Sequence, residues 1–89
     1  MRTSIIKLQM SKITTIAKIL EDRFPKPSKI VIKDVNNDEK HFDISIESAL
    51  FKGKSLVEQH QFVYEPLKTL IDTNDIHALQ IKTHTLDEQ

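Results

Sequence analysis

Residues 41–48, HFDISIES, alternate strictly between polar and apolar side chains. Phe42, Ile44 and Ile46 therefore point to one side of an extended strand, while the polar residues between them point to the other side. Such a strand has one buried face and one wet face, which is typical of a sheet covered on one side only. The rest of the chain must supply the layer that covers the apolar side.

A second, shorter strand is predicted at residues 29–34, KIVIKD, because this run is rich in β-branched side chains. The connecting segment, VNNDEK, contains Asn36, Asn37 and Asp38, which tolerate tight backbone turns. Strands that follow each other through a short turn pair in opposite directions. We therefore expect an antiparallel hairpin.

The first helix is predicted before these strands. Its apolar side chains recur with helical spacing and are Ile13, Ile16, Ala17, Leu20 and Phe24. Ser11 has the side chain of an N-cap residue. The helix is expected to end near Phe24, because Pro25 disfavours helical geometry in the residue before it and Pro27 prevents an early restart.

A second helix is predicted after Gly53, the only glycine in the chain. Ser55 and Glu58 have the spacing of a capping box, so this helix should begin at about residue 56. Its expected apolar stripe consists of Leu56, Val63, Leu67 and Leu70, with Val57, Tyr64 and Ile71 beside it. The pattern continues to about residue 72, with a bend expected at residues 62–66 because Pro66 removes one helical hydrogen bond.

The third strand is predicted within residues 76–83, IHALQIKT, where Leu79 and Ile81 alternate with Gln80 and Lys82. A strand, helix, strand connection is normally a right-handed crossover to a parallel partner, so this strand should run parallel to the second one. The element order is then αββαβ. We predict an α+β, type II KH-like domain, in which both helices cover one face of a three-stranded mixed sheet.

Composition limits the classes of function. A chain of 89 residues forms one domain, and its thirteen basic and thirteen acidic side chains cancel. It therefore lacks the broad positive field with which non-specific nucleic-acid binders recruit phosphates. The chain has no cysteine, so any metal ligand must be a histidine or a carboxylate. No apolar run approaches the roughly 20 residues that span a bilayer. We expect a cytoplasmic protein without a membrane partner, or a mitochondrial one if the source is eukaryotic, since residues 1–20 contain no acidic residue.

Several motifs resemble the BolA family, especially its shorter members. HFDISIES resembles the family's SHF strand, FKGKS its F-x-G-x-S loop, EQHQFVYEPL its R-H-R-x-V-Y helix, and IHALQIKTHTLDE its C-terminal segment. The resemblance covers residues 11–88. It implies a BolA-like domain at residues 11–89, preceded by an extension of residues 1–10 that can be disordered, with Met1 and Met10 as alternative starts.

The resemblance implies a non-enzymatic protein that partners a monothiol glutaredoxin in the assembly or trafficking of [2Fe-2S] clusters, or in iron-status signalling. His77 matches the family histidine that binds a cluster shared with the glutaredoxin. His41 is expected to be the second ligand, because the starts of two parallel strands lie at one end of the sheet. His60 matches the helix histidine of the family, but it is expected to be a packing residue more than a ligand. Alone, the chain is expected to bind no cofactor and to be a monomer or a weak homodimer.

An alternative implied by the resemblance is a DNA-binding regulator of stress response and morphology. Its contact residues would be Lys52, Gly53, Lys54, Gln59 and His60. The chain departs from the family here, because Gln59 and Gln61 replace arginines and remove two positive charges. The turn at residues 35–40 also lacks the cysteine or extra histidine of many family members. No nucleophile with an adjacent base and no short-spaced histidine pair for zinc is evident, so neither an enzyme nor a mononuclear zinc site is expected.

Overall fold

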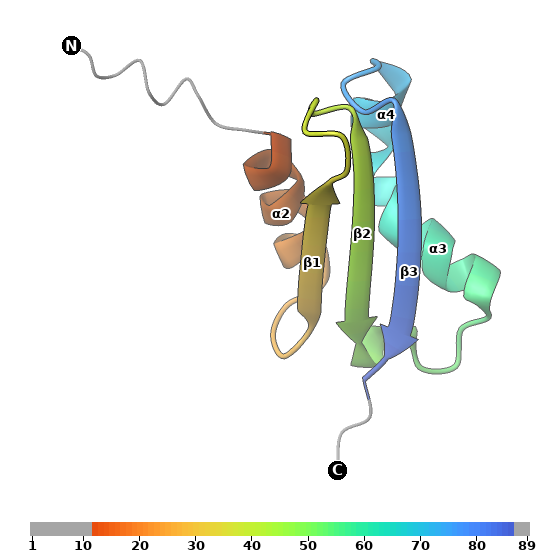
Figure 1. The fold of residues 1–89 in the computed structure, drawn as a ribbon. Helices are drawn as coiled ribbons and strands as arrows, with labels where there is room; N and C mark the ends of the chain where they lie inside the picture. Colours follow the sequence, from red (N-terminus) through yellow and green to blue (C-terminus); the bar gives the residue numbers. More distant parts are fainter. Residues whose placement is uncertain (1–11, 87–89) are drawn as a thin grey trace.

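The computed structural model describes residues 12–86, which form two layers (Figure 1). The helical elements are α2 (Lys12–Arg23), η1 (Ala49–Phe51), α3 (Leu56–Tyr64), η2 (Glu65–Leu67) and α4 (Lys68–Asp72). The strands are β1 (Lys29–Asp34), β2 (His41–Ser48) and β3 (Ala78–Thr85), in the sheet order β1-β2-β3. This arrangement confirms the predicted α+β fold with a three-stranded mixed sheet.

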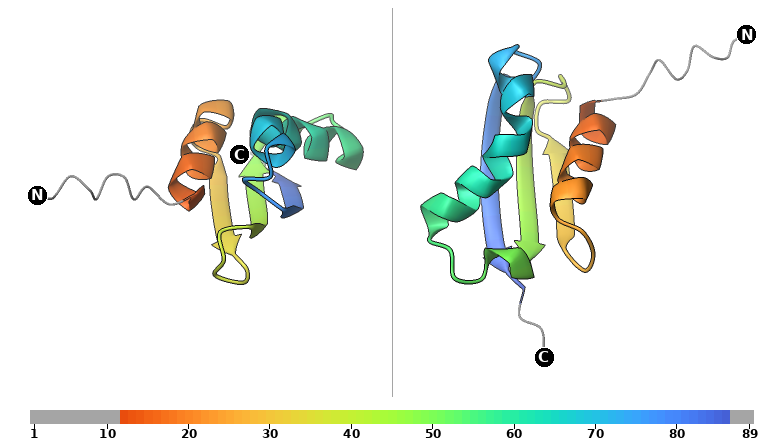
Figure 2. Two further views of the ribbon diagram at one scale, coloured as in Figure 1. Left: turned by 90° about the horizontal axis from the view of Figure 1, so that it is seen from above. Right: turned by 180° about the vertical axis from the view of Figure 1, so that it is seen from behind.

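The register of the sheet follows the alternation in the sequence. β1 runs antiparallel to β2 and pairs Ile30 with Ile46, whereas β3 runs parallel to β2 and pairs Ile44 with Ile81. Figure 2 shows α2 and the α3–α4 segment on the same side of the sheet. Phe42, Ile44 and Ile46 point to that side and are buried, as their spacing predicts.

The core lies between the sheet and the helices. Its fully buried apolar side chains are Ile16, Leu20, Phe24, Phe42, Ile44, Ile46, Phe51, Val63, Leu67 and Ile76. Phe24 contacts Phe51 and Phe62 with ring centroids 5.2 and 5.3 Å apart, and Arg23 lies over the Phe62 ring at 4.2 Å. This aromatic cluster joins the end of α2 to η1 and α3. Burial of the Phe24 and Phe51 rings, which are fully buried, stabilises the fold by about 2 kcal/mol or more each.

The predicted start and end of the first helix have different outcomes. Ser11, the expected N-cap, lies outside the described residues, as do residues 1–10. The helix ends at Arg23, and the Phe24 amide still donates to the carbonyl of Leu20 at 2.7 Å, which agrees with the predicted end near Phe24.

Within residues 12–86, no helix is both long enough and apolar enough to cross a membrane.

The start of α3 has the predicted capping box. The Ser55 hydroxyl accepts from the Glu58 amide at 3.1 Å, and the Glu58 carboxylate accepts from the Ser55 amide at 2.8 Å. Gly53 has a φ of 81° with no atom within 4 Å of where a Cβ would lie, so its backbone angle, and not crowding, favours glycine there. The predicted bend is the 3₁₀ segment η2, which contains Pro66.

The predicted apolar stripe of the second helix is wrong at its N-terminal end. Leu56 and Val57 are 61% and 65% exposed, and at the other end of α3 Tyr64, expected beside the stripe, is 38% exposed. The reason is geometric, because η2 interrupts the helix and the first turns of α3 extend beyond the edge of β3 (Figures 1 and 2). Val63 and Leu67 do face the core, so only the later part of the stripe covers the sheet.

The capping box can be tested by substitution. Ser55→Ala should lower the free energy of unfolding by about 1 kcal/mol, because the Glu58 amide at the start of α3 loses its side-chain partner. Ser55→Asp retains an acceptor oxygen at the N-cap and should lose much less. Urea denaturation measures both values. An equal loss in the two variants would show that the hydroxyl's acceptor role does not stabilise this helix.

Candidate functional site

Two histidines meet at one end of the sheet. The parallel register pairs His41 with Ala78, so His77 lies directly before the residue opposite His41. The two imidazole rings are 6.1 Å apart between centroids and inclined at 73°. The predicted convergence of these two residues is therefore confirmed. Their role as ligands stays a prediction.

The backbone of His77 is fixed although its side chain is exposed. The His77 amide donates to the carbonyl of Lys40 at 2.8 Å, and the Ala78 amide donates to the same oxygen at 3.1 Å. The preceding residue, Ile76, is fully buried in the core, and its amide donates to the carbonyl of Leu70. The segment is thus held to α4 on one side and to the β1–β2 turn on the other.

His41 is held by Asp38 in the same turn. One carboxylate oxygen of Asp38 accepts from the amides of Lys40 and His41, and the other lies 2.8 Å from Nδ1 of His41. The hydrogen bond from the Lys40 amide is the main reason why the pKa of the Asp38 carboxyl lies below its ordinary value. Desolvation opposes this shift, and the bond to His41 adds to it. Asp34 steadies the turn by accepting from the amides of Asp38 and Glu39.

The Asp38 contact selects one form of the His41 ring. An ionised carboxylate can only accept, so Nδ1 must carry the proton of this hydrogen bond. In the neutral imidazole, Nε2 then has its lone pair free to bind a metal. Carboxylate–histidine pairs commonly orient metal-binding imidazoles in this way. The sequence interpretation placed Asp38 only in a turn, although the spacing of Asp38 and His41 was a signal of this contact.

The site offers two imidazoles and needs other ligands to complete a metal centre. Imidazole nitrogens bind metals at about 2 Å, so two rings on one metal have centres about 5 to 6 Å apart. The separation of the His41 and His77 rings is close to this value. Among the described residues, no group of three or more His, Cys, Asp or Glu side chains is placed to hold a metal ion. Residues 12–86 therefore offer this pair no third ligand.

A lysine from α2 also reaches this end of the molecule. Nζ of Lys12 donates to the carbonyl of Asp75 at 2.8 Å, and the Lys12 amide approaches the Glu39 carboxylate at 3.4 Å. The first residue of α2 thereby contacts both loops that carry the histidines.

The other two histidines lie elsewhere. His60 is half-buried and lines a hollow with Val57, Gln61, Tyr64 and Ile81, which we call the edge hollow. His84 is exposed near the C-terminal end of β3, where it pairs in register with Glu47. The structure therefore brings only His41 and His77 together.

The residues of the predicted DNA contact are divided between two places. Lys52, Gly53 and Lys54 line a shallow hollow together with the acidic residues Glu58 and Glu65, whereas His60 lines the edge hollow. Gln59 is bound internally, since its amide group donates to the Lys54 carbonyl and its oxygen accepts from the Thr83 hydroxyl. These contacts leave Gln59 with a structural role that the sequence did not indicate.

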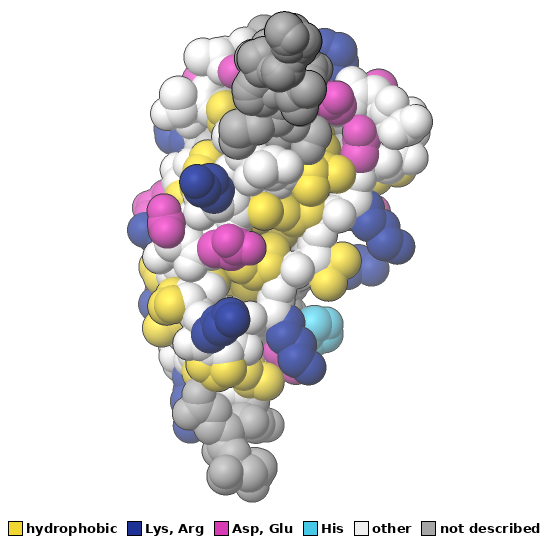
Figure 3. Space-filling model, turned by 90° about the vertical axis from the view of Figure 1, so that its left-hand side faces the viewer, with side chains coloured by type: hydrophobic (Ala, Val, Ile, Leu, Met, Phe, Trp, Pro, Cys, Tyr) yellow, Lys and Arg dark blue, Asp and Glu magenta, His cyan; other side chains and the backbone are white. Residues whose placement is uncertain are grey.

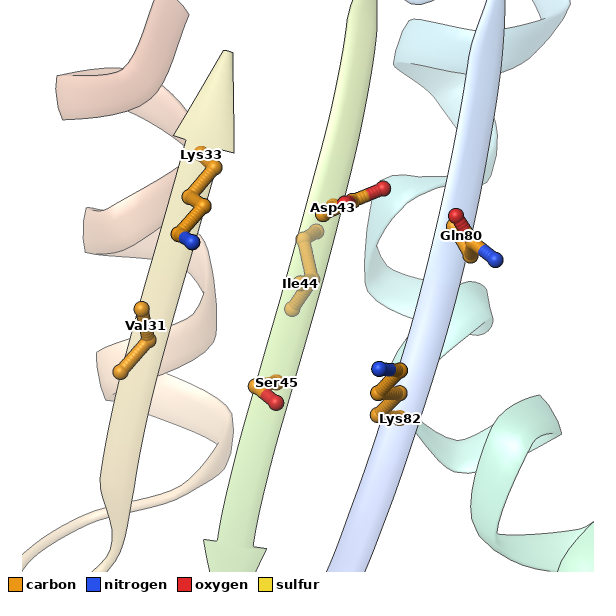
Figure 4. A pocket seen from close by; sticks show the side chains of 7 residues that line it. All are labelled: Val31, Lys33, Asp43, Ile44, Ser45, Gln80 and Lys82. Atoms are coloured by element: carbon orange, nitrogen blue, oxygen red, sulfur yellow. The ribbon is translucent and has the colours of Figure 1, made fainter. Parts of the chain in front are cut away.

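Charges are also mixed on two other parts of the surface, the α2–β1 side and the wet face of the sheet (Figures 3 and 4). On the side of the molecule that faces the viewer in Figure 3, basic and acidic side chains are interspersed with hydrophobic ones. On the wet face of the sheet, Figure 4 shows a shallow hollow lined by two lysines, Lys33 and Lys82, on the outer strands and by Asp43 and Ser45 on the central strand. Neither surface presents a field of one sign to a phosphate backbone.

Known proteins resemble this chain in sequence and in structure. The sequence model of BolA-like proteins matches residues 18–88. The acid stress protein IbaG of Escherichia coli is 43% identical over 51 residues, which are 57% of this chain and 61% of IbaG. BolA1 from Arabidopsis thaliana has a TM-score of 0.78 and 32% identity, covering 90% of this chain and 98% of that chain. The BolA domain of SufE1 from the same plant has a TM-score of 0.69 and 30% identity, covering 85% and 93% of the two chains.

The lowered pKa of Asp38 predicts a pH-dependent contribution to stability. A carboxyl whose pKa is lower in the folded state than its unfolded value of about 3.9 stabilises the fold above that pH. This contribution is lost as the pH falls through the folded pKa. Asp38→Asn should therefore be less stable than the wild type at about pH 6, with a difference that shrinks toward about pH 3. Urea denaturation across this range, with Asp22→Asn as a control for net charge, measures the effect. A difference that is constant with pH would contradict it.

The ring form of His41 gives a second prediction. In the neutral state, ¹⁵N NMR should show the proton of His41 on Nδ1. Asp38→Asn should give a mixture of the two forms, because an amide can donate as well as accept and no longer selects one tautomer. A wild-type ring protonated on Nε2 would contradict the assignment.

Proposed function

The chain belongs to the BolA-like protein family, and from this premise we propose that it is a non-enzymatic partner of a monothiol glutaredoxin. In this proposal, the two proteins share a [2Fe-2S] cluster as cargo during cluster assembly, trafficking or iron-status signalling. His77 and His41 supply imidazole ligands, and the glutaredoxin and glutathione supply thiolates.

The approach of His41 and His77 at one end of the sheet carries this proposal. The two residues come from segments far apart in the sequence, and each backbone is held by hydrogen bonds. Imidazole is a suitable ligand for iron, and replacing thiolate with histidine on one iron of a [2Fe-2S] centre raises its reduction potential. The histidines would thus tune the shared cluster as well as bind it.

The ligand count explains why the partner must contribute. A [2Fe-2S] cluster takes four ligands from its surroundings, and this chain has no cysteine. The two histidines supply half of that number at most. A protein with this donor set can receive or pass on a cluster only while a thiolate donor is bound, so transfer depends on the complex.

Asp38 would act through His41. It does not reach the cluster in this proposal, but it orients the imidazole and leaves Nε2 free. Loss of such an outer contact typically lowers metal affinity by about 10- to 100-fold. Asp38→Asn should therefore weaken cluster retention while leaving the binding of the cluster-free glutaredoxin unchanged.

The ligand assignment can be tested by anaerobic reconstitution of the complex with a monothiol glutaredoxin. His77→Ala should alter the visible circular dichroism spectrum of the shared cluster, and His41→Ala should do so as well. Pulsed electron paramagnetic resonance of the reduced cluster should lose a ¹⁴N coupling in each variant. His84→Ala is the matched control, because it removes an exposed histidine at the other end of β3.

Each part of the proposal has its own contradicting result. Spectra of His77→Ala that equal those of the wild type would remove His77 from the ligand set. If no complex forms between the wild-type protein and the cluster-free glutaredoxin in calorimetry or gel filtration, and no cluster is shared, the partner assignment is wrong.

A further inference from the structure

β3 is an edge strand whose outer side has no partner. The sheet order places β3 next to β2 only, so within residues 12–86 no strand pairs with its other side. β3 has eight residues and contains neither proline nor glycine. Every second residue of an unpaired edge directs its backbone N–H and C=O groups outward, where another strand can bind them.

Apolar side chains lie beside this edge. The start of α3 extends beyond β3, as the two opposite views in Figures 1 and 2 show. Val57 and Tyr64 line the edge hollow with Ile81 of β3, and Val57 is 65% exposed. No charged side chain lines this hollow. A strand added to β3 would lie along the hollow and cover these groups.

The other edge of the sheet is better protected. β1 has only six residues, of which Lys29, Lys33 and Asp34 are charged. β3 carries a single charged side chain, Lys82, and Lys residues are a common means of protecting an edge. The chain as a whole has a net charge of zero at neutral pH, so long-range repulsion between two copies is weak.

We propose that the outer edge of β3 pairs with β3 of a second copy of this chain, in antiparallel orientation, to form a continuous six-stranded sheet. The two-fold axis passes midway between the two copies of Ile81, so the register is centred on this residue. In this register Ile81 lies opposite its own copy, Gln80 opposite Lys82, Leu79 opposite Thr83, and Ala78 opposite His84. Seven of the eight residues of β3 are paired, and no like charges lie opposite each other.

Other antiparallel registers pair fewer residues or place like charges opposite each other. Opposed residues must share a face of the sheet, so the register must be centred on one residue, with the axis midway between its two copies. A register centred on Lys82 places two like charges directly opposite each other, which is destabilising. A register centred on Gln80 pairs only residues 78–82. The register centred on Ile81 also brings the two Ile81 side chains together on the helix side, next to Val57 and Tyr64 of both copies.

The interface can be tested with two valine substitutions. Val57→Glu places a charge in the edge hollow, and because acidic residues are favourable in the first turn of a helix, the fold should tolerate it. Val31→Glu is the matched control, since Val31 is 54% exposed but lies on β1, away from the interface. Sedimentation velocity over a concentration series should show dimerisation of the wild type, at least tenfold weaker dimerisation of Val57→Glu, and no change in Val31→Glu.

The register can be tested separately by disulfide crosslinking. The chain has no cysteine of its own, so only the introduced cysteines can react. Gln80→Cys and Lys82→Cys proteins are prepared separately and then oxidised alone or as a mixture. Opposed residues in antiparallel strands have Cβ atoms about 4.5 to 5.5 Å apart, and diagonal neighbours about 7 to 8 Å. The mixture should therefore form a disulfide-linked heterodimer faster than either protein forms a homodimer.

Several results would overturn the proposal. A wild-type protein that remains monomeric at about 1 mM would do so, because that limit corresponds to a Kd weaker than millimolar. Equal effects of Val57→Glu and Val31→Glu would exclude the edge hollow, and a mixture that crosslinks no faster than the single proteins would exclude this register. Binding of DNA, or of an extended segment of another protein, that is lost only in Val57→Glu while the protein stays monomeric would assign the edge to that partner instead. None of these tests involves His41 or His77, so they stand apart from the cluster proposal.

Discussion

Parallel pairing of β2 with β3 requires the chain to return from one end of the sheet to the other before β3 can begin. The α3–η2–α4 segment makes that return on the covered face of the sheet, and its buried residues Val63 and Leu67 close the core. The same pairing places the first residues of both strands at one end. His41 and His77 are therefore neighbours because of the topology. β3 is an outer strand because, among the described residues, it pairs only with β2, whose other side is taken by β1.

The histidine pair combines an exposed His77 and a half-buried His41 with a constrained backbone. The Lys40 carbonyl accepts two amides from the segment at His77, and Asp38 holds both the backbone and the ring of His41. This arrangement reduces the conformational freedom that the rings would lose on binding a metal, which favours affinity. It also leaves both rings accessible to another molecule, as the proposed shared cluster requires.

Most of the fold could be predicted from the sequence because its signals are local. The alternation at residues 41–48 and the β-branched run at residues 29–34 match β2 and β1, and the Ser55 and Glu58 spacing marks the start of α3. Helical periodicity failed at Leu56 and Val57, because it does not tell where the sheet beneath a helix ends. Asp38 and Gln59 were missed since their contacts depend on turn geometry and on residues distant in the sequence, such as Thr83.

The hydrogen bond from Lys12 to the Asp75 carbonyl has a practical consequence for anyone who labels or immobilises this protein. Whatever precedes residue 12 enters the domain next to the two loops that carry His41 and His77, whereas β3 ends at the opposite end of the sheet (Figure 1). A label joined directly to residue 12 would therefore lie at the end of the sheet where the proposed partner docks, whereas a label on the last residues of β3 would lie at the other end.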